Sequence, residues 1–225
     1  MISLKNITKK YEINKNNTVV ALQNVDIEIK EGELVILKGA SGSGKSSILS
    51  LIAALSKPTS GEVIVDEKHI SKLPDNFASD YRRDNIGFIF QKYNLIPTLS
   101  VKENIILPLV PLNPDAEDVK QKLDRVLKLF KIEHKEDAVV KNLSGGEQQR
   151  VAIARANINN PKIIIADEPT ANLDEKLSLH FIEILKELKA EGKTIVVATH
   201  DPLFFDLDFV DVVVEMHSGK VVSVG

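Results

Sequence analysis

The chain contains no cysteine and no tryptophan, and aromatic residues make up only 5% of its 225 residues. Without cysteine there can be no disulfide, no thiolate nucleophile and no cysteine-ligated metal. The longest apolar run, residues 105–112, has eight residues that include two prolines, whereas a membrane-spanning helix needs about 18 or more. The sequence therefore predicts a chain that does not cross a membrane.

The chain also lacks an excess of charge of one sign. Its 29 Lys and Arg residues oppose 32 Asp and Glu residues, and the formal net charge is -3. Without a broad basic surface, we expect no nucleic-acid partner. Residues 1–11 alternate polar and apolar side chains and have no apolar signal-peptide segment, so we expect a cytoplasmic protein. The length fits one compact domain, or a core with an insert.

The apolar patterns predict strands of two kinds. Residues 25–29 alternate apolar and charged side chains, which is typical of a half-buried strand in an antiparallel N-terminal sheet. Residues 34–37, 163–166 and 195–198 are apolar without alternation. Such runs are typical of strands that are buried on both faces of a parallel sheet.

Helical periodicity lies between these strands. Residues 177–188 carry an apolar stripe, with Asp174 placed to cap the helix and Gly192 to end it, and residues 116–130 carry a second stripe. Strands that alternate with helices predict an α/β core. Residues 92–160 show helix patterns and no buried strand. We therefore predict one domain, with an α/β core of residues 1–91 and 161–225 and an inserted helical subdomain of residues 92–160.

A phosphate-binding loop follows the first buried run. Residues 39–46 fit the pattern GxxxxGK[ST], and an apolar helix pattern comes directly after them. We expect Lys45 to reach the β- and γ-phosphates of a nucleotide and the Ser46 hydroxyl to bind magnesium. The alternative, a flexible turn with a solvated lysine, does not account for the flanking strand and helix. The candidate residues of this loop are Gly39, Ser41, Gly42, Ser43, Gly44, Lys45, Ser46 and Ser47.

The other two buried runs end in polar residues. Asp167 and Glu168 follow one, and His200 follows the other. Since open α/β sheets bind ligands at the carboxyl ends of their strands, we expect these side chains beside the loop. Asp167 would hold magnesium, Glu168 would polarise the attacking water, and His200 would contact the γ-phosphate or that water. Taken alone, the carboxylates could begin an ordinary loop, and the histidine could be structural.

A second anion site is indicated by a serine and two glycines ahead of a helix pattern. Bare backbone N–H groups, a hydroxyl and the positive end of a helix attract phosphate. Because one nucleotide already has its phosphates in the first loop, this site points to a different subunit. The alternative is an ordinary capping box between Ser144 and Glu147. The candidate residues are Ser144, Gly145, Gly146, Glu147 and Gln148.

Together these residues resemble the ATP-binding subunit of an ABC transporter over nearly the whole chain. The motifs are GASGSGKS (Walker A), Gln91 in IGFIFQ (Q-loop), LSGGEQ (signature), IIIADE (Walker B), Ala171-Asn172-Leu173-Asp174 (D-loop) and His200 (switch histidine). The resemblance implies a P-loop ATPase fold, ATP and Mg²⁺ as cofactors, and a head-to-tail homodimer with two ATP molecules between the subunits.

The resemblance also implies roles for single residues and a location. Gln91 would sense the γ-phosphate, help to hold magnesium, and couple the site to the helical insert. Tyr11 matches the adenine-stacking aromatic, and the alternative is a surface tyrosine at a strand end. The insert would dock on integral membrane permease subunits, at the cytoplasmic face of the inner membrane.

Finer similarity is to the lipoprotein-releasing and macrolide-exporting branch, the LolD and MacB type. It rests on residues 81–83, the stretch IGFIFQKYNLIPTLSVKENIILPL and the stretch DEPTANLD. We therefore expect export or lipoprotein release, with an FtsE-like role in cell division or cell-wall remodelling as the alternative. The chain departs from the usual family pattern at Ala40, Ser47, Ala171 and Asn157, and none of these removes an expected phosphate or magnesium contact.

Overall fold

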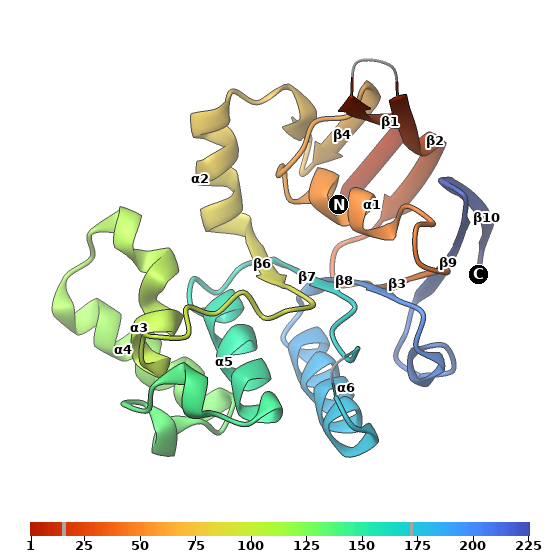
Figure 1. Ribbon diagram of the computed structural model, residues 1–225. Helices are drawn as coiled ribbons and strands as arrows, with labels where there is room; N and C mark the ends of the chain where they lie inside the picture. The colour runs from red at the N-terminus through yellow and green to blue at the C-terminus, as the bar shows by residue number, and fades with distance from the viewer. Residues whose placement is uncertain (15–16, 172) are drawn as a thin grey trace.

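In the computed structural model, which describes residues 1–14, 17–171 and 173–225, the chain folds around two β-sheets (Figure 1). Within these residues the larger sheet has the order β10-β9-β3-β8-β7-β6 and the smaller has the order β2-β1-β4-β5. The larger sheet contains β3 (Leu34–Lys38), β6 (Ile86–Ile89), β7 (Ile163–Asp167), β8 (Thr194–Thr199), β9 (Val212–His217) and β10 (Lys220–Val224). The smaller sheet contains β1 (Ile2–Asn14), β2 (Asn17–Ile29), β4 (Ser60–Val65) and β5 (Lys68–His69).

The larger sheet is parallel at its centre. Strand β3 pairs in parallel with β8 and β9, and β7 pairs in parallel with β6 and β8, whereas β10 is antiparallel to β9. Residues 34–37, 164–166 and 195–198 are at most 1% exposed, and burial of one such large apolar side chain contributes about 1.5–3 kcal/mol. These strands confirm the prediction from the uninterrupted apolar runs.

Two hydrophobic cores lie on the two faces of this sheet. On one face, Val35 and Leu37 pack with α1 (Lys45–Ile52) and with the antiparallel sheet, which confirms the predicted N-terminal sheet. On the other face, Leu34 and Ile36 pack with α5 (Gly145–Asn157) and α6 (Glu175–Ala190). Figure 1 shows α1 above the parallel strands, with α5 and α6 below them. The predicted α/β class is therefore confirmed.

Helix α6 begins and ends as the sequence predicts. The carboxylate of Asp174 accepts a hydrogen bond from the Leu177 N–H at 2.8 Å. Gly192, just after the helix, has a left-handed backbone with a φ of +81°. The second predicted helix is α4 (Ala116–Leu129), capped by Asp115.

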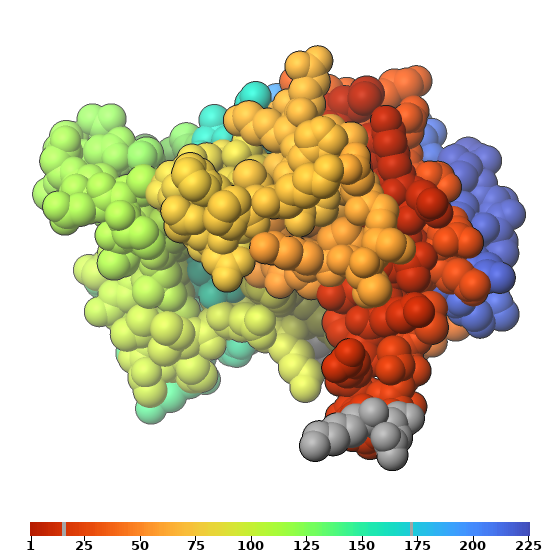
Figure 2. Space-filling view, turned by 90° about the horizontal axis from the view of Figure 1, so that it is seen from above, coloured from red at the N-terminus to blue at the C-terminus, as the bar shows by residue number. Residues whose placement is uncertain are grey.

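Residues 92–160 are helical throughout their regular structure. They contain α3 (Val101–Ile106), the short 3₁₀ helices η2 (Leu107–Leu112), η3 (Glu133–Lys135) and η4 (Val140–Asn142), and helices α4 and α5. In this stretch, all of which the structure describes, strand-like pairing is limited to the single bridge between Ser100 and Val139. Figure 2 shows these residues, in green, standing out on one side of the molecule. The boundaries of the subdomain stay a prediction.

Some elements were not predicted from the sequence. They include α2 (Asp75–Asn85), strands β4, β5, β6, β9 and β10, and the 3₁₀ helices η1 (Ile70–Lys72) and η5 (Pro202–Phe204). Helix α2 is strongly polar and buries only Ala78 and Tyr81, so it has no wide apolar stripe. Among the described residues, no helix has both the length and the apolar character that a membrane crossing requires.

Strand β6 depends on a glycine at its centre. A Cβ atom on Gly87 would lie 2.4 Å from the backbone oxygen of Ala156, at the end of α5, and 2.8 Å from the Ile164 side chain. The missing side chain lets β6 approach α5 closely. A glycine within a strand is unfavourable in isolation, so the sequence pattern alone does not indicate this strand.

We expect Gly87→Ala to lower the free energy of unfolding by about 1–3 kcal/mol, because the backbone of α5 or β6 must move to admit the methyl group. Urea unfolding followed by circular dichroism measures the effect. Gly145→Ala is the matched control for stability, since its Cβ would meet nothing within 4 Å. Equal stability of the two variants would contradict the close approach.

Candidate nucleotide-binding site

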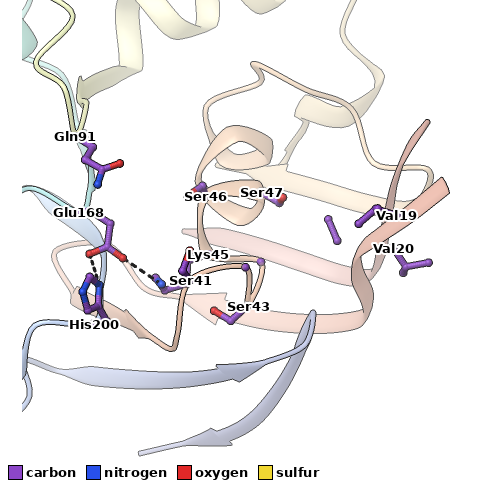
Figure 3. Close-up of a pocket in the computed structure, with 13 residues that line it drawn as sticks. Val19, Val20, Ser41, Ser43, Lys45, Ser46, Ser47, Gln91, Glu168 and His200 are labelled. Carbon is purple, nitrogen blue, oxygen red and sulfur yellow. Dashed lines mark hydrogen bonds and ion pairs between the residues drawn. The ribbon is translucent and has the colours of Figure 1, made fainter. Parts of the chain in front are cut away.

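A cavity of about 380 Å³ lies where the parallel strands end. In Figure 3, Gln91, Glu168 and His200 stand on one side, the loop around Lys45 faces them, and Val19 and Val20 lie at the far end. The cavity is lined by Val19, Val20, Ala21, Ser41, Gly42, Ser43, Gly44, Lys45, Ser46, Ser47, Gln91, Glu168 and His200. The structure thus brings together most of the predicted loop and the residues expected around it.

The loop between β3 and α1 contains glycines that no other residue type can replace without strain. A Cβ on Gly39 would lie 2.5 Å from the Met216 backbone oxygen. Gly44, the residue that caps α1, has a φ of +106°, and its Cβ would lie 2.7 Å from the Ala21 backbone oxygen. This packing directs the N-terminus of α1, with its partial positive charge, at the cavity.

Lys45 is the buried cation of the site. Its side chain is 5% exposed, and Nζ donates to the backbone oxygens of Gly39 at 2.7 Å and Ala40 at 3.2 Å. Nζ also lies 3.2 Å from Oε1 of Glu168. A buried ammonium needs such partners, because desolvation of an unpaired charge is costly. An incoming phosphate would offer it stronger anionic acceptors.

Glu168 joins two of the predicted catalytic groups. Its Oε1 faces Lys45, and its Oε2 accepts a hydrogen bond from Nδ1 of His200 at 2.9 Å. The backbone of Glu168 has a φ of +44°. Residues other than glycine seldom adopt this conformation, and it is often found at functional sites. The three groups form one chain across the cavity, as Figure 3 shows.

Ser46 and Asp167 form the candidate magnesium site. The Ser46 hydroxyl donates to Oδ1 of Asp167 at 3.0 Å. Burial raises the pKa of Asp167, and the hydrogen bond from Ser46 offsets only part of that rise. Mg²⁺ prefers hard oxygen ligands and commonly takes one or two from the protein with substrate phosphates and water. The hydroxyl and the carboxylate therefore fit this ion.

Gln91 follows β6 and lines the cavity opposite the loop. The strand brings it there because β6 is parallel to β7, so Gln91 and Glu168 both follow carboxyl ends at the same edge. Gln91 thus lies within the predicted site, at the border of the helical subdomain.

The end of the cavity away from Lys45 is formed by Val19, Val20 and Ala21 of β2, which sequence reasoning missed. Their position depends on the packing of β2 against the loop that contains Gly44. No local sequence pattern predicts that packing. Tyr11, the predicted adenine-stacking residue, pairs with Val19 across the sheet but is not among the lining residues. Its ring is 40% exposed and lies under Nζ of Lys9, 4.8 Å from the ring centroid.

Tyr11 nevertheless lies near the start of α1. Burial alone would raise the pKa of its hydroxyl, but hydrogen bonding with Ser47, and to a smaller extent with Ser50 and Ser56, lowers the pKa below its ordinary value. The Tyr11 hydroxyl therefore lies near Ser47, a residue that does line the cavity.

The signature residues lie elsewhere. Ser144 caps α5 in a capping box with Glu147, so the alternative interpretation of this sequence is confirmed as local structure. Gly146 packs on Leu177 of α6, where a Cβ would lie 2.6 Å from a leucine methyl, whereas the space beside Gly145 is open. None of the signature residues is among those that line the cavity in the described part of the chain.

Hydrogen bonds join helix α5 to two segments beside the cavity, and the sequence did not reveal them. Arg155, near its C-terminal end, donates to the backbone oxygens of Tyr93 and Asn94, both at 2.6 Å. These two residues follow Gln91 and have φ values of +60° and +49°. Gln149, in the middle of the helix, donates to the Pro169 oxygen at 3.1 Å, next to Glu168.

One of the family departures has a structural explanation. Asn157 is 2% exposed and donates to the Ile153 backbone oxygen within α5, so its amide is satisfied inside the core. Ala171 belongs to the expected D-loop, of which Asn172 lies outside the described residues.

Comparison with known proteins gives a consistent family. A family model described as ABC transporter matches residues 22–171. The uncharacterized ABC transporter ATP-binding protein MJ0796 of Methanocaldococcus jannaschii is 48% identical over 206 residues, which cover 89% of this chain and 87% of that protein. The macrolide export ATP-binding/permease protein MacB of Campylobacter jejuni is 46% identical over 202 residues, 90% of this chain but 31% of that longer protein.

Solved structures agree with this result. A dimeric structure of MJ0796 in a post-hydrolysis state, bound to ADP and Pi, matches with a TM-score of 0.91 and 42% identity, over 100% of this chain and 98% of that one. The family model covers most of the chain and includes the loop, Gln91, the signature and Glu168. The chain therefore belongs to the ATP-binding subunits of ABC transporters, and it is an ATPase.

Proposed function

We propose that two copies of this chain bind two Mg-ATP between them, and that ATP-driven closure and hydrolysis do work on separate membrane permease subunits. The observation that carries the proposal is the separation of two phosphate-attracting sites in one chain. Lys45 and its neighbours line the cavity, whereas Ser144 and the N-terminus of α5 lie outside it. A second copy, placed head to tail, would bring Ser144 to the first copy's γ-phosphate.

Each polar residue of the cavity would have its own role in hydrolysis. Phosphate oxygens would replace Glu168 and the loop carbonyls as partners of Lys45. Glu168, released from Lys45 but still bonded to His200, would then position and deprotonate the attacking water. Lys45, His200 and the partner's Ser144 would stabilise the charge that develops on the transferred phosphoryl group.

Ser46 and Asp167, with Gln91 close by, would hold magnesium, which would supply positive charge against the charge of the phosphates. Ser46 would have to turn its hydroxyl lone pairs to the ion, giving up its hydrogen bond to Asp167. Gln91 would report the presence of the γ-phosphate to the segment that Arg155 holds.

The permease would bind beside that segment. A groove of about 300 Å³ lies between the core and the helical insert, and its lining includes the stacked rings of Phe88 and Phe90 together with Pro108 and Pro111. Arg155 also lines it, and the same side chain donates to the backbone oxygens of Tyr93 and Asn94, which follow Gln91. An apolar segment of a membrane subunit that enters this groove would sense movement at Gln91.

The transport direction that we propose is export, including release of lipoproteins. It is supported by the 46% identity to MacB, which is a macrolide export protein, and by the motifs of that branch. The membrane protein that co-purifies with this chain tests this: a permease of the exporter type supports the proposal, and a cell-division partner overturns it.

Glu168→Gln should bind ATP and accumulate as a dimer while hydrolysis falls by about 100-fold or more, because the general base is lost and the shape of the site is kept. Phosphate release and size-exclusion chromatography with light scattering measure the two effects. Glu28→Gln, on the exposed side of β2, is the control with the same chemical change. Normal turnover by Glu168→Gln would remove Glu168 from the proposed role.

Asp167→Asn should stabilise the nucleotide-free protein above acidic pH and abolish the extra stability that Mg-ATP confers. Because the folded-state pKa of Asp167 is raised, its favourable contribution is present below the unfolded pKa and is lost as pH rises through the folded value. The gain from the substitution therefore grows with pH over that window. Urea unfolding at several pH values, with and without Mg-ATP, measures it.

Asp211→Asn is the control with the opposite sign. Burial alone would raise the pKa of Asp211, but its hydrogen bonds to Lys189 and the Leu34 N–H lower it. This carboxylate contributes stability above its unfolded pKa, so Asp211→Asn should destabilise the protein at neutral pH. If both variants changed stability in the same direction, the raised pKa of Asp167 would be contradicted.

Val20→Asp should weaken ATP and ADP binding alike, by about tenfold, since a carboxylate would replace an apolar wall at the nucleoside end and oppose the phosphates. Isothermal titration calorimetry with both nucleotides measures it. Val222→Asp, an exposed residue on β10, is the control. A loss confined to ATP would place Val20 near the γ-phosphate instead.

A further inference from the structure

Glu147 places a negative charge at the helix end that is expected to receive a phosphate. The carboxylate belongs to the third residue of α5, three positions after Ser144. Its hydrogen bonds with the backbone and then the side chain of Ser144, aided by Lys135, lower the pKa of Glu147 to about 2. Glu147 is therefore ionised at any physiological pH, and an uncompensated carboxylate here would repel the γ-phosphate.

The same carboxylate also accepts a hydrogen bond from the hydroxyl of Ser144. Oε2 of Glu147 accepts from the Ser144 N–H and from the Ser144 Oγ–H, both at 2.8 Å. A serine hydroxyl has a single proton to donate. In this arrangement that proton is directed at Glu147 and is not available to a nucleotide.

Lys135 compensates the charge. Its Nζ lies 3.2 Å from Oε1 of Glu147, the oxygen that does not bind Ser144. Lys135 ends η3, in the connection between α4 and α5, so it approaches from outside the signature helix. The glutamate is 16% exposed and the lysine 37% exposed, which screens the pair less than a fully solvated one.

We propose that Lys135 is a positioning residue of the signature: it compensates Glu147, so that the helix end stays attractive to phosphate and the Ser144 hydroxyl can turn from Glu147 to the partner's γ-phosphate. When the hydroxyl turns away, Glu147 loses one donor and keeps the Ser144 N–H and the ion pair. This inference rests on the proposed function, since it assumes that Ser144 serves the nucleotide of a second copy.

The test uses the full chain in the Glu168→Gln background, in which ATP-bound dimers persist. Lys135→Gln should raise the dissociation constant of the ATP-bound dimer by about tenfold, because each of two sites loses a charge interaction of roughly threefold. Sedimentation velocity over a range of protein concentrations measures the constant. ATP affinity at concentrations where the chain is monomeric should not change, since Lys135 lies outside the cavity.

Rescue separates charge compensation from a merely structural role. Adding Glu147→Gln to Lys135→Gln should restore dimerisation, because no charge is left to compensate and a glutamine can still cap Ser144. The defect of Lys135→Gln should also shrink as salt is raised. Lys141→Gln, which removes the same charge from an exposed position three residues before Ser144, should dimerise like the parent.

Each outcome decides a different claim. If the Glu168→Gln parent forms no ATP-dependent dimer, the proposed function fails and this inference fails with it. If the parent dimerises and Lys135→Gln does so equally well, only the role of Lys135 is overturned. A double variant that remains as impaired as Lys135→Gln would also overturn it, because the lysine would then act on the fold and not on the charge of Glu147.

Discussion

The site depends on the parallel pairing of β3, β6, β7 and β8. Parallel strands end at one edge, and their carboxyl ends here carry the phosphate loop, Gln91, Glu168 and His200. The pairing is fixed by burial: a shift of one residue in any of these strands would exchange the side chains that face the two cores. The same apolar packing that stabilises the fold therefore sets the spacing of the polar groups, none of which has to stabilise the sheet.

The polar groups at that edge are partners of one another. Lys45 is satisfied by two backbone oxygens and Glu168, and Glu168 is satisfied in turn by His200. Burial of such a set costs little only while every member has a partner. In the proposed function, substrate phosphates would replace partners and leave no charge unpaired. The signature follows the same principle on a smaller scale, with Glu147 between Ser144 and Lys135.

Sequence reasoning found the groups whose chemistry is local. The loop around Lys45 follows directly from its glycines and the flanking strand and helix, and the pair of Ser144 and Glu147 follows from a spacing of three residues. It missed contacts that depend on tertiary placement. Val20 lines the cavity because β2 packs against the loop around Lys45. Arg155 bonds to Asn94, just after the Q-loop residue Gln91, although the two are 61 positions apart in the sequence.

Strand β6 was missed for a related reason, since its central Gly87 is unfavourable for a strand and is explained only by the nearness of α5.

Helix α5 is a stiff rod that has Arg155 near its C-terminal end and the signature residues at its N-terminal end. Its 13 residues span about 18 Å at 1.5 Å per residue. Arg155 binds one end to the two residues with left-handed backbone that follow Gln91. A tilt of about 5° about that anchor would carry the opposite end sideways by about 1.5 Å, over half the length of a hydrogen bond. In the proposed dimer, a small displacement at one subunit's nucleotide would thus become a gain or loss of contact at the other's.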